Sequence, residues 1–344
     1  MDDMTERETL KSQFIARSGW QDATVSLLAG DASNRRYDRL QRPDGTGCVL
    51  MDAPPEKGED TEPFIAMTTY LTSLGLSAPK ILKADSKNGF LLIEDLGDDL
   101  YSKHILKTPG DEQTLYRAAL DALIHLQGAA AKTLPRYDAA VMSGLAGLSV
   151  EWYATAATGM PDVHAQTIMR HAMSDALHPL ENSTAVVVLR DYHAENLIWL
   201  PDRDGVARVG LLDFQDAMLG HPLYDVVSIL QDARRDVRPE LETELLAYFI
   251  TQSGANSADS HAAYAALGAQ RALRIIGVFT RLCIRDGKGS YIDLIPRVWA
   301  HLQRNLAHPN LENLASVVAK TLAQPTPEIL DGLRKKCPIP PAQS

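Results

Sequence analysis

Two polar loops set between apolar segments constrain this 344-residue chain more than any other feature. Asp191 stands five residues before Asn196, in the run Leu-Arg-Asp-Tyr-His-Ala-Glu-Asn-Leu (residues 189–197). Asp213 follows Asn196 after a further seventeen residues, and it ends an apolar run that is typical of a strand. Carboxylate and amide oxygens are ligands that Mg²⁺ prefers. The two loops therefore supply an oxygen base and two hard oxygen ligands in a fixed order.

This order is the one that kinase-type phosphoryl transfer uses. In that reaction one Asp accepts the proton of the substrate hydroxyl, and an Asn and a second Asp hold the Mg²⁺ ions that bridge the nucleotide phosphates. We therefore predict that Asp191 is the catalytic base, that Asn196 and Asp213 are the metal ligands, and that ATP and Mg²⁺ are the cofactors. The alternative is two unrelated surface turns, but the strand-like runs that flank both loops favour the site.

Four further polar residues close to these loops each allow two interpretations. His193 either holds Asp191 or a neighbouring loop through a hydrogen bond, with a contact to the substrate also expected, or is an ordinary packed histidine. Arg190 either orients the loop by pairing with a carboxylate, or is a surface arginine. Asp225 either braces the loop as a buried carboxylate, or only occupies a first helical turn, where the helix dipole favours an acid. Asp216 either faces the acceptor or is a turn residue.

The first 95 or so residues indicate a small antiparallel sheet that carries one helix. Alternating β-type runs separated by Gly, Pro and Asn turns predict strands, and an apolar face that begins after a Pro predicts a helix. The expected strands are residues 25–29, 36–40, 48–52 and 90–95, and the expected helix is residues 63–74. A further helix should precede the first strand.

From residue 98 onward the pattern is mainly helical, as in the apolar stripe at helical spacing between Leu115 and Leu126. Short strands at 186–189, 197–200 and 206–212 interrupt it and carry the polar loops. We therefore predict an α+β chain of two lobes, a sheet-containing N-lobe (1–95) and a mainly helical C-lobe (96–344).

Composition narrows the class of protein. A formal net charge of −10 argues against a non-specific nucleic-acid surface. No apolar stretch approaches the roughly 18 residues of a membrane span. Three cysteines without paired spacing argue against a disulfide framework or a zinc site, and the polar N-terminal segment is unlike a signal peptide. A cytoplasmic enzyme of small molecules is the expectation, with no nucleic-acid or membrane partner; the oligomeric state stays open, and a monomer is compatible with the sequence.

Several strings together resemble the aminoglycoside phosphotransferase and choline kinase-like superfamily, which has a two-lobed protein-kinase-like fold. The strings LRDYHAENL and LDFQDAMLGHPLYDVV carry this resemblance, which spans most of the chain. The strings DASNRRY, LPRYD, EWY, YDVVSILQDA and IRDGKGSY are similar to one subgroup, the bacterial anomeric kinases of N-acetylmuramate and N-acetylglucosamine in cell-wall sugar recycling. The resemblance implies phosphorylation of the C1 hydroxyl, and Glu94, Asp95 and Leu96 as the hinge that binds adenine.

One departure from the superfamily concerns the cation that holds the phosphates. The strand expected at 48–52 has no lysine, and the helix expected at 63–74 has no acidic residue to pair with one. Both partners of the usual ion pair are thus absent together, which leaves no buried charge unpaired. The loop of Ser33 and Asn34, which should cover the phosphates, continues into two candidate replacements, Arg35 and Arg36. Lys57 is a third.

The acceptor is less constrained by the sequence. N-acetylmuramate is anionic, and four arginines that could favour it lie on one helical stretch: Arg271, Arg274, Arg281 and Arg285. A solvated helix face is an equal interpretation of them. The alternatives to a sugar 1-kinase are a kinase of another small alcohol, such as an aminoglycoside or an amino alcohol, and a pseudokinase without catalysis, which the missing lysine would suit.

Overall fold

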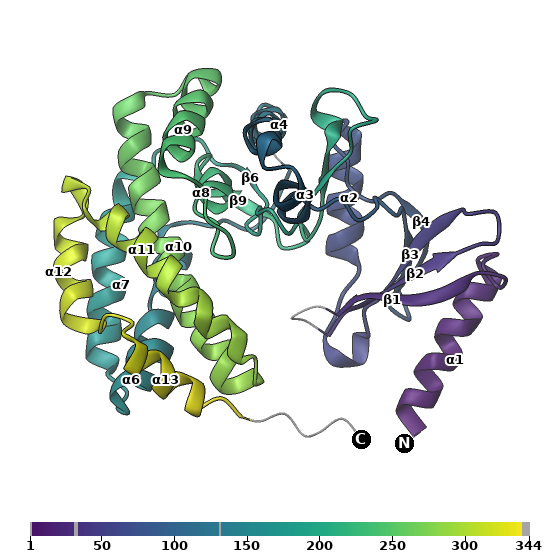
Figure 1. Ribbon diagram of the computed structural model, residues 1–344, viewed down its shortest axis with the longest axis horizontal. Helices are drawn as coiled ribbons and strands as arrows, with labels where there is room; N and C mark the ends of the chain where they lie inside the picture. Colours follow the sequence, from purple (N-terminus) through teal and green to yellow (C-terminus); the bar gives the residue numbers. More distant parts are fainter. Residues whose placement is uncertain (1, 31–33, 131, 339–344) are drawn as a thin grey trace. The chain divides into compact units, whose positions relative to one another are not determined.

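The computed structural model describes residues 2–30, 34–130 and 132–338 (Figure 1). The chain forms two compact units, each built from two segments. Unit 1 consists of Met1–Ala129 and Ala194–Ala217, and unit 2 consists of Ala130–His193 and Met218–Ser344. Each unit groups the segments of the chain that pack most closely with one another. The predicted lobes, 1–95 and 96–344, divide the chain by its pattern of elements and stay a prediction.

Unit 1 contains the antiparallel sheet that the sequence predicts. Its strands are β1 (Thr24–Gly30), β2 (Arg36–Gln41), β3 (Gly47–Asp52), β4 (Ile81–Asp85) and β5 (Phe90–Ile93), in the order β1-β2-β3-β5-β4. Every neighbouring pair is antiparallel. The predicted fold class, an antiparallel sheet near the N-terminus followed by a largely helical remainder, is confirmed.

The two faces of this sheet have different coverings. Helix α1 (Asp2–Arg17) packs Phe14 against Leu50 of β3 and stacks it on Phe90 of β5, with ring centroids 5.6 Å apart. Because side chains alternate along a strand, Val49 next to Leu50 points to the opposite face. Helix α2 (Glu62–Ser73) belongs to that second face, since its Phe64 lines the same cavity as Val49.

A two-stranded ladder in unit 1 carries the two predicted metal ligands. Strands β7 (Leu197–Trp199) and β8 (Val209–Leu211) pair antiparallel, with Leu197 opposite Leu211. Asn196 comes directly before β7 and Asp213 comes two residues after β8, so both lie at one end of the ladder. Helices α3 (Tyr101–Lys107) and α4 (Glu112–Gln127) complete the unit. The stripe predicted between Leu115 and Leu126 is the buried face of α4.

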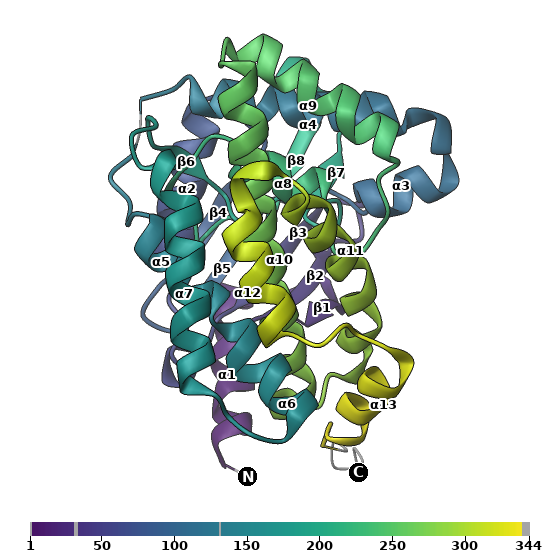
Figure 2. The ribbon, with the colours of Figure 1, turned by 90° about the vertical axis from the view of Figure 1, so that its left-hand side faces the viewer.

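Unit 2 is built around the long helix α10 (Ser257–Asp286), which packs against several of its other helices (Figure 2). A short ladder of β6 (Val186–Val188) and β9 (Met218–Gly220) leads into α8 (Tyr224–Leu230). The remaining helices are α5 (Ala139–Ala146), π-helical η3 (Ser149–Ala154), α6 (Thr155–Thr158), α7 (Val163–Leu177), α9 (Pro239–Ser253), α11 (Ile295–Leu306), α12 (Glu312–Thr321) and α13 (Pro327–Lys335).

Four details of the predicted elements were wrong. Strands β4 and β9 were not predicted. The segment expected as a strand at 206–212 begins with a 3₁₀ turn and is extended only over Val209–Leu211. The strand expected at 90–95 ends at Ile93. Helix α2 begins one residue before the predicted start at residue 63, so it includes the acidic residue Glu62. The side chain of Glu62 is exposed in the first turn. Within the described residues, no helix is long and apolar enough to span a membrane.

The turn between β4 and β5 yields a stability prediction. Gly89 has a φ of +72°, and a Cβ there would overlap with the carbonyl oxygen of Ala53. Gly45 has a φ of +87° but open space around it, so it is a matched control. We expect Gly45→Ala to lower the stability by about 1–2 kcal/mol through its backbone alone. Gly89→Ala should cost about 1–3 kcal/mol more, because the overlap is added. Chemical denaturation of both variants checks this, and equal losses would contradict it.

Candidate active site

The predicted metal ligands lie side by side in unit 1. The Asn196 amide nitrogen is 3.4 Å from Asp213 Oδ2, and the backbone N–H of Leu212 donates to the carbonyl of Asn196 at 2.9 Å. Gln215 Nε2 donates to Asp213 Oδ1 at 2.7 Å and orients the carboxylate. Asp213 has a φ of 55°, a left-handed conformation that Asp adopts more readily than most residues. The fold therefore fixes one carboxylate and one amide at the end of a rigid ladder.

This pair of residues fits a magnesium–nucleotide site. The described residues contain no group of three or more His, Cys, Asp or Glu that could enclose a metal ion. Mg²⁺ in phosphoryl-transfer sites is commonly held by one or two carboxylates, with substrate phosphates and water completing its shell. Asp213 and Asn196 offer oxygen donors of this kind, and no group in the described part of the chain competes as a full protein cage.

A cavity of about 400 Å³ opens beside this pair within unit 1. Its described lining includes Val49, Phe64, Ile93, Glu94–Asp98, Lys103, Asn196, Ile198, Leu212 and Asp213. The lining thus combines apolar side chains with the two predicted metal ligands. The main-chain N–H of Leu96 has no main-chain partner among the described residues. A largely apolar cavity with an available main-chain donor in its lining is suited to a purine ring.

The side chains of the predicted hinge have structural partners. Glu94 accepts a hydrogen bond from Arg203 Nη2 at 2.7 Å, and Asp95 accepts one from Arg39 Nη2 at 3.0 Å. The main-chain N–H of Glu94 also donates to the carbonyl of Lys80 at 2.8 Å, so the main-chain groups of Asp95 and Leu96 are what remains for a ligand. No local pattern predicts these two arginines as partners, because the pairs are 109 and 56 residues apart in the chain.

The predicted phosphate loop is tied to its neighbour. Ser33 lies outside the described residues. The main-chain N–H of Asn34 and the Arg35 Nε donate to the two oxygens of Glu59, at 3.0 and 2.8 Å. Arg36 is half exposed and donates to Asp38 at 3.1 Å. Of the described residues that line the cavity, the one Lys or Arg is Lys103, which the sequence analysis missed.

In unit 2, a buried carboxylate holds the loop of the predicted base. Asp225 is fully buried at the start of α8 and accepts hydrogen bonds from the backbone N–H groups of Leu189 and Arg190, at 2.6 and 2.9 Å. Burial raises the pKa of Asp225 to about 7, although these two donors and Arg271 act against the shift. Of the two interpretations of Asp225, this geometry corresponds to the bracing carboxylate.

Asp191, which follows this braced turn, lies in a positive field. Burial raises the pKa of its carboxyl, but the charges of Arg274 and Arg271 outweigh burial and leave the pKa below its ordinary value. Arg274 in turn donates to the hydroxyl of Tyr224 at 3.1 Å. Asp191 is consequently ionised at neutral pH, as a proton acceptor must be.

The other predicted residues differ in their surroundings. His193 is buried, and burial lowers its pKa to about 4, so the ring is neutral at pH 7. Its Nε2 is 3.4 Å from Arg234 Nη1. The Arg190 guanidinium lies over the ring of Tyr137, 5.2 Å from its centroid, and its backbone has a φ of 71°. Asp216 is exposed and belongs to unit 1.

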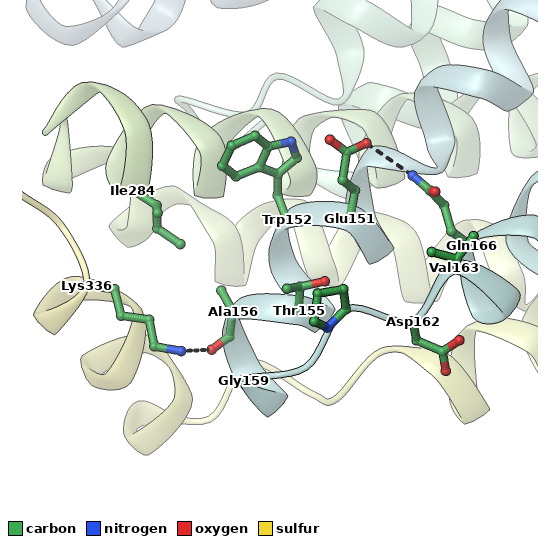
Figure 3. Close-up of a pocket in the computed structure, with 11 residues that line it drawn as sticks. Glu151, Trp152, Thr155, Ala156, Gly159, Asp162, Val163, Gln166, Ile284 and Lys336 are labelled. Carbon is green, nitrogen blue, oxygen red and sulfur yellow. Dashed lines mark hydrogen bonds between the residues drawn. The ribbon is translucent and has the colours of Figure 1, made fainter.

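A second cavity, of about 520 Å³, lies in unit 2 (Figure 3). Trp152 and Ile284 face it from η3 and α10, together with polar side chains. Glu151 accepts a hydrogen bond from Gln166 Nε2 at 3.1 Å, and Lys336 donates to the carbonyl of Ala156. An aromatic wall with carboxylate and amide groups is suited to a polar, ring-shaped ligand. Glu151 and Trp152 belong to the string EWY, for which the sequence predicted no role.

Comparison with known proteins gives consistent matches. The model of a phosphotransferase enzyme family matches residues 24–267. The chain is 38% identical to a protein named N-acetylmuramate/N-acetylglucosamine kinase from Caulobacter vibrioides, over 90% of this chain and 95% of that protein. It is 35% identical to a Pseudomonas aeruginosa protein of the same name, over 90% and 93% of the two chains.

The solved structures agree in fold. A choline/ethanolamine kinase family protein from Mesorhizobium loti superposes with a TM-score of 0.63 at 14% identity, covering 92% of this chain and 99% of that one. At this identity the likeness concerns the fold alone. The family model, however, covers well over half of the chain, and the curated relatives cover most of it. The chain therefore belongs to the phosphotransferase enzyme family.

Proposed function

We propose that this protein is an ATP-dependent kinase that phosphorylates the anomeric C1 hydroxyl of N-acetylmuramate, N-acetylglucosamine or both. The observation that carries the proposal is identity of 35–38% to relatives of that name over about nine-tenths of the chain. The C1 hydroxyl is proposed as the site of phosphorylation because the sequence resembles the anomeric kinases of cell-wall sugar recycling. A cytoplasmic enzyme that acts on free sugars is the corresponding cellular role.

In this proposal unit 1 binds the nucleotide. The apolar lining of the 400 Å³ cavity receives adenine beside Leu96, and Asp213 and Asn196, which also line the cavity, hold Mg²⁺. Magnesium neutralises charge on the phosphates when it is bound. Lys103, and the predicted Asn34, Arg35 and Arg36, are the groups proposed to contact the ribose or phosphates in place of the absent strand lysine.

Asp191 is the proposed base. Because Arg274 and Arg271 keep its carboxyl ionised, it can orient the acceptor hydroxyl and take its proton as the new bond to phosphorus forms. His193, neutral at pH 7, and Arg190 are proposed to support this loop rather than to exchange protons. Most of the rate enhancement then comes from positioning and electrostatics, as is general for phosphoryl transfer.

A panel of acceptors tests the proposal directly. ADP release should depend on N-acetylmuramate or N-acetylglucosamine, and not on aminoglycosides, choline or ethanolamine. Transfer to C1 removes the reducing end, so reducing-sugar signal should disappear in proportion to ADP formed. ADP release with the reducing end retained would contradict the anomeric position. An absence of release with every sugar would favour the pseudokinase alternative.

Asp191→Asn keeps the size of the side chain but removes its basicity. We expect kcat to fall by about 10²–10⁴-fold, the usual range for loss of a general base. The KM for ATP and the affinity for the nucleotide should change little, because Asp191 contributes to the acceptor side. Steady-state kinetics and calorimetry check this. A kcat within threefold of the parent would remove Asp191 from its proposed role.

Asp213→Asn removes the only carboxylate proposed for the metal, while Asn tolerates the left-handed backbone that position 213 requires. We expect the Mg²⁺-dependent part of ATP affinity to be lost and the Mg²⁺-independent part to remain. Calorimetric titration of ATP with Mg²⁺ and with EDTA separates the two. Unchanged Mg-ATP affinity would show that the metal is held elsewhere.

A further inference from the structure

Four arginines of α10 differ in how they are engaged. Arg271 is buried and donates to the hydroxyl of Ser228 at 2.7 Å, and Arg274 donates to that of Tyr224. Arg285 is exposed and forms a close ion pair with its chain neighbour Asp286, at 2.6 Å. The sequence could not distinguish these residues, but their surroundings now do.

Arg281 is the exception among the four. It is half-buried, its Nε is buried without a hydrogen-bond partner, and within the described residues its guanidinium forms no hydrogen bond or ion pair. Its charge contributes to lowering the pKa of Asp286, but the hydrogen bond from Arg285 is the main cause of that shift. A guanidinium that is partly removed from water without a hydrogen-bond partner loses part of its hydration free energy, and no protein contact compensates for this loss. An anionic ligand would supply the missing partner.

The position of Arg281 along α10 indicates where this anion sits. Arg274, whose charge lowers the pKa of Asp191, precedes Arg281 by seven residues, which is two helical turns and about 10 Å along the same face. Ile284, one turn beyond Arg281, lines the 520 Å³ cavity opposite Trp152 (Figure 3). Arg281 thus lies between the proposed base and a cavity suited to a sugar-sized ligand.

The chemistry of the two named sugars differs by one anionic group. N-acetylmuramate is N-acetylglucosamine with a lactyl ether on O3, and that ether ends in a carboxylate. In either sugar O3 is bonded to C3, two ring carbons from C1, and the lactyl chain extends outward from it. With C1 at Asp191, this chain would carry the carboxylate away from C1, where a cation farther along α10, such as Arg281, can meet it. Arginine is the cation best suited to a carboxylate, because its fork can donate two parallel hydrogen bonds.

We propose that Arg281 binds the lactyl carboxylate of N-acetylmuramate and thereby sets the preference for this sugar over N-acetylglucosamine. This inference rests on the proposed function. It assigns Arg281 to substrate selection and leaves the phosphoryl transfer itself to the groups already described. The neutral sugar binds without this contact.

The test compares both sugars in the same variants. Arg281→Gln should lower the ratio of kcat/KM for N-acetylmuramate to that for N-acetylglucosamine by roughly 10- to 150-fold, the value of one charge-assisted hydrogen bond. The loss should appear mainly in the KM for N-acetylmuramate. Arg281→Lys keeps a cation and should restore part of the ratio. Arg285→Gln, a change at an exposed arginine that already has a partner, is the matched control and should leave the ratio as in the parent.

The outcomes separate this inference from the proposed function. Activity of the parent protein on either sugar tests the function first. If the parent is active and Arg281→Gln leaves the ratio unchanged, or lowers both activities equally, Arg281 does not select the carboxylate and the inference is wrong. A parent without activity on either sugar would overturn both. Thermal unfolding of each variant, together with its remaining N-acetylglucosamine activity, identifies a loss that comes only from misfolding.

Discussion

The carboxylate of Asp225 is the interaction on which the candidate base depends. It takes up the backbone N–H groups of two successive residues, Leu189 and Arg190, just where the chain leaves β6. These donors would otherwise be buried and unpaired in a turn that no sheet or helix can satisfy. The same bonds hold Arg190 in a left-handed conformation, which is costly for a long side chain. Several contacts therefore fix the direction in which the chain runs from the strand to Asp191.

A related arrangement occurs at the proposed metal ligand. Among the described residues, Arg190 and Asp213 are the only non-glycine positions with a positive φ. One directly precedes the proposed base, and the other is a proposed ligand. Strained conformations persist only where neighbouring contacts enforce them, and they concentrate at functional sites. Asp225 enforces the first, and Gln215 with the β7–β8 ladder surrounds the second. In each unit, the end of a short strand thus fixes one of these carboxylates: Asp191 follows β6 in unit 2, and Asp213 follows β8 in unit 1.

What the sequence predicted correctly depends on signals that are local. The stripe of α4 repeats at helical spacing over several turns, and β3 is a short continuous apolar run, and both elements were predicted. Strand β4 was missed because it is an edge strand with mostly exposed side chains, so it lacks an alternating apolar pattern. The partners of Glu94 and Asp95 were missed because Arg203 and Arg39 reach them only through the fold. The same limit left four arginines of α10 equivalent until their contacts were known.

The low pKa of Asp191 has a consequence for the kind of acceptor. A carboxylate whose pKa Arg274 and Arg271 lower is ionised at neutral pH and weakly basic, so it accepts a proton most readily once the hydroxyl has become acidic. In a loose phosphoryl-transfer transition state this occurs late, after bonding to phosphorus has begun. An anomeric hydroxyl is more acidic than an ordinary alcohol, because the ring oxygen withdraws electron density from C1. A sugar hemiacetal as acceptor is therefore compatible with a proposed base whose pKa these two arginines lower.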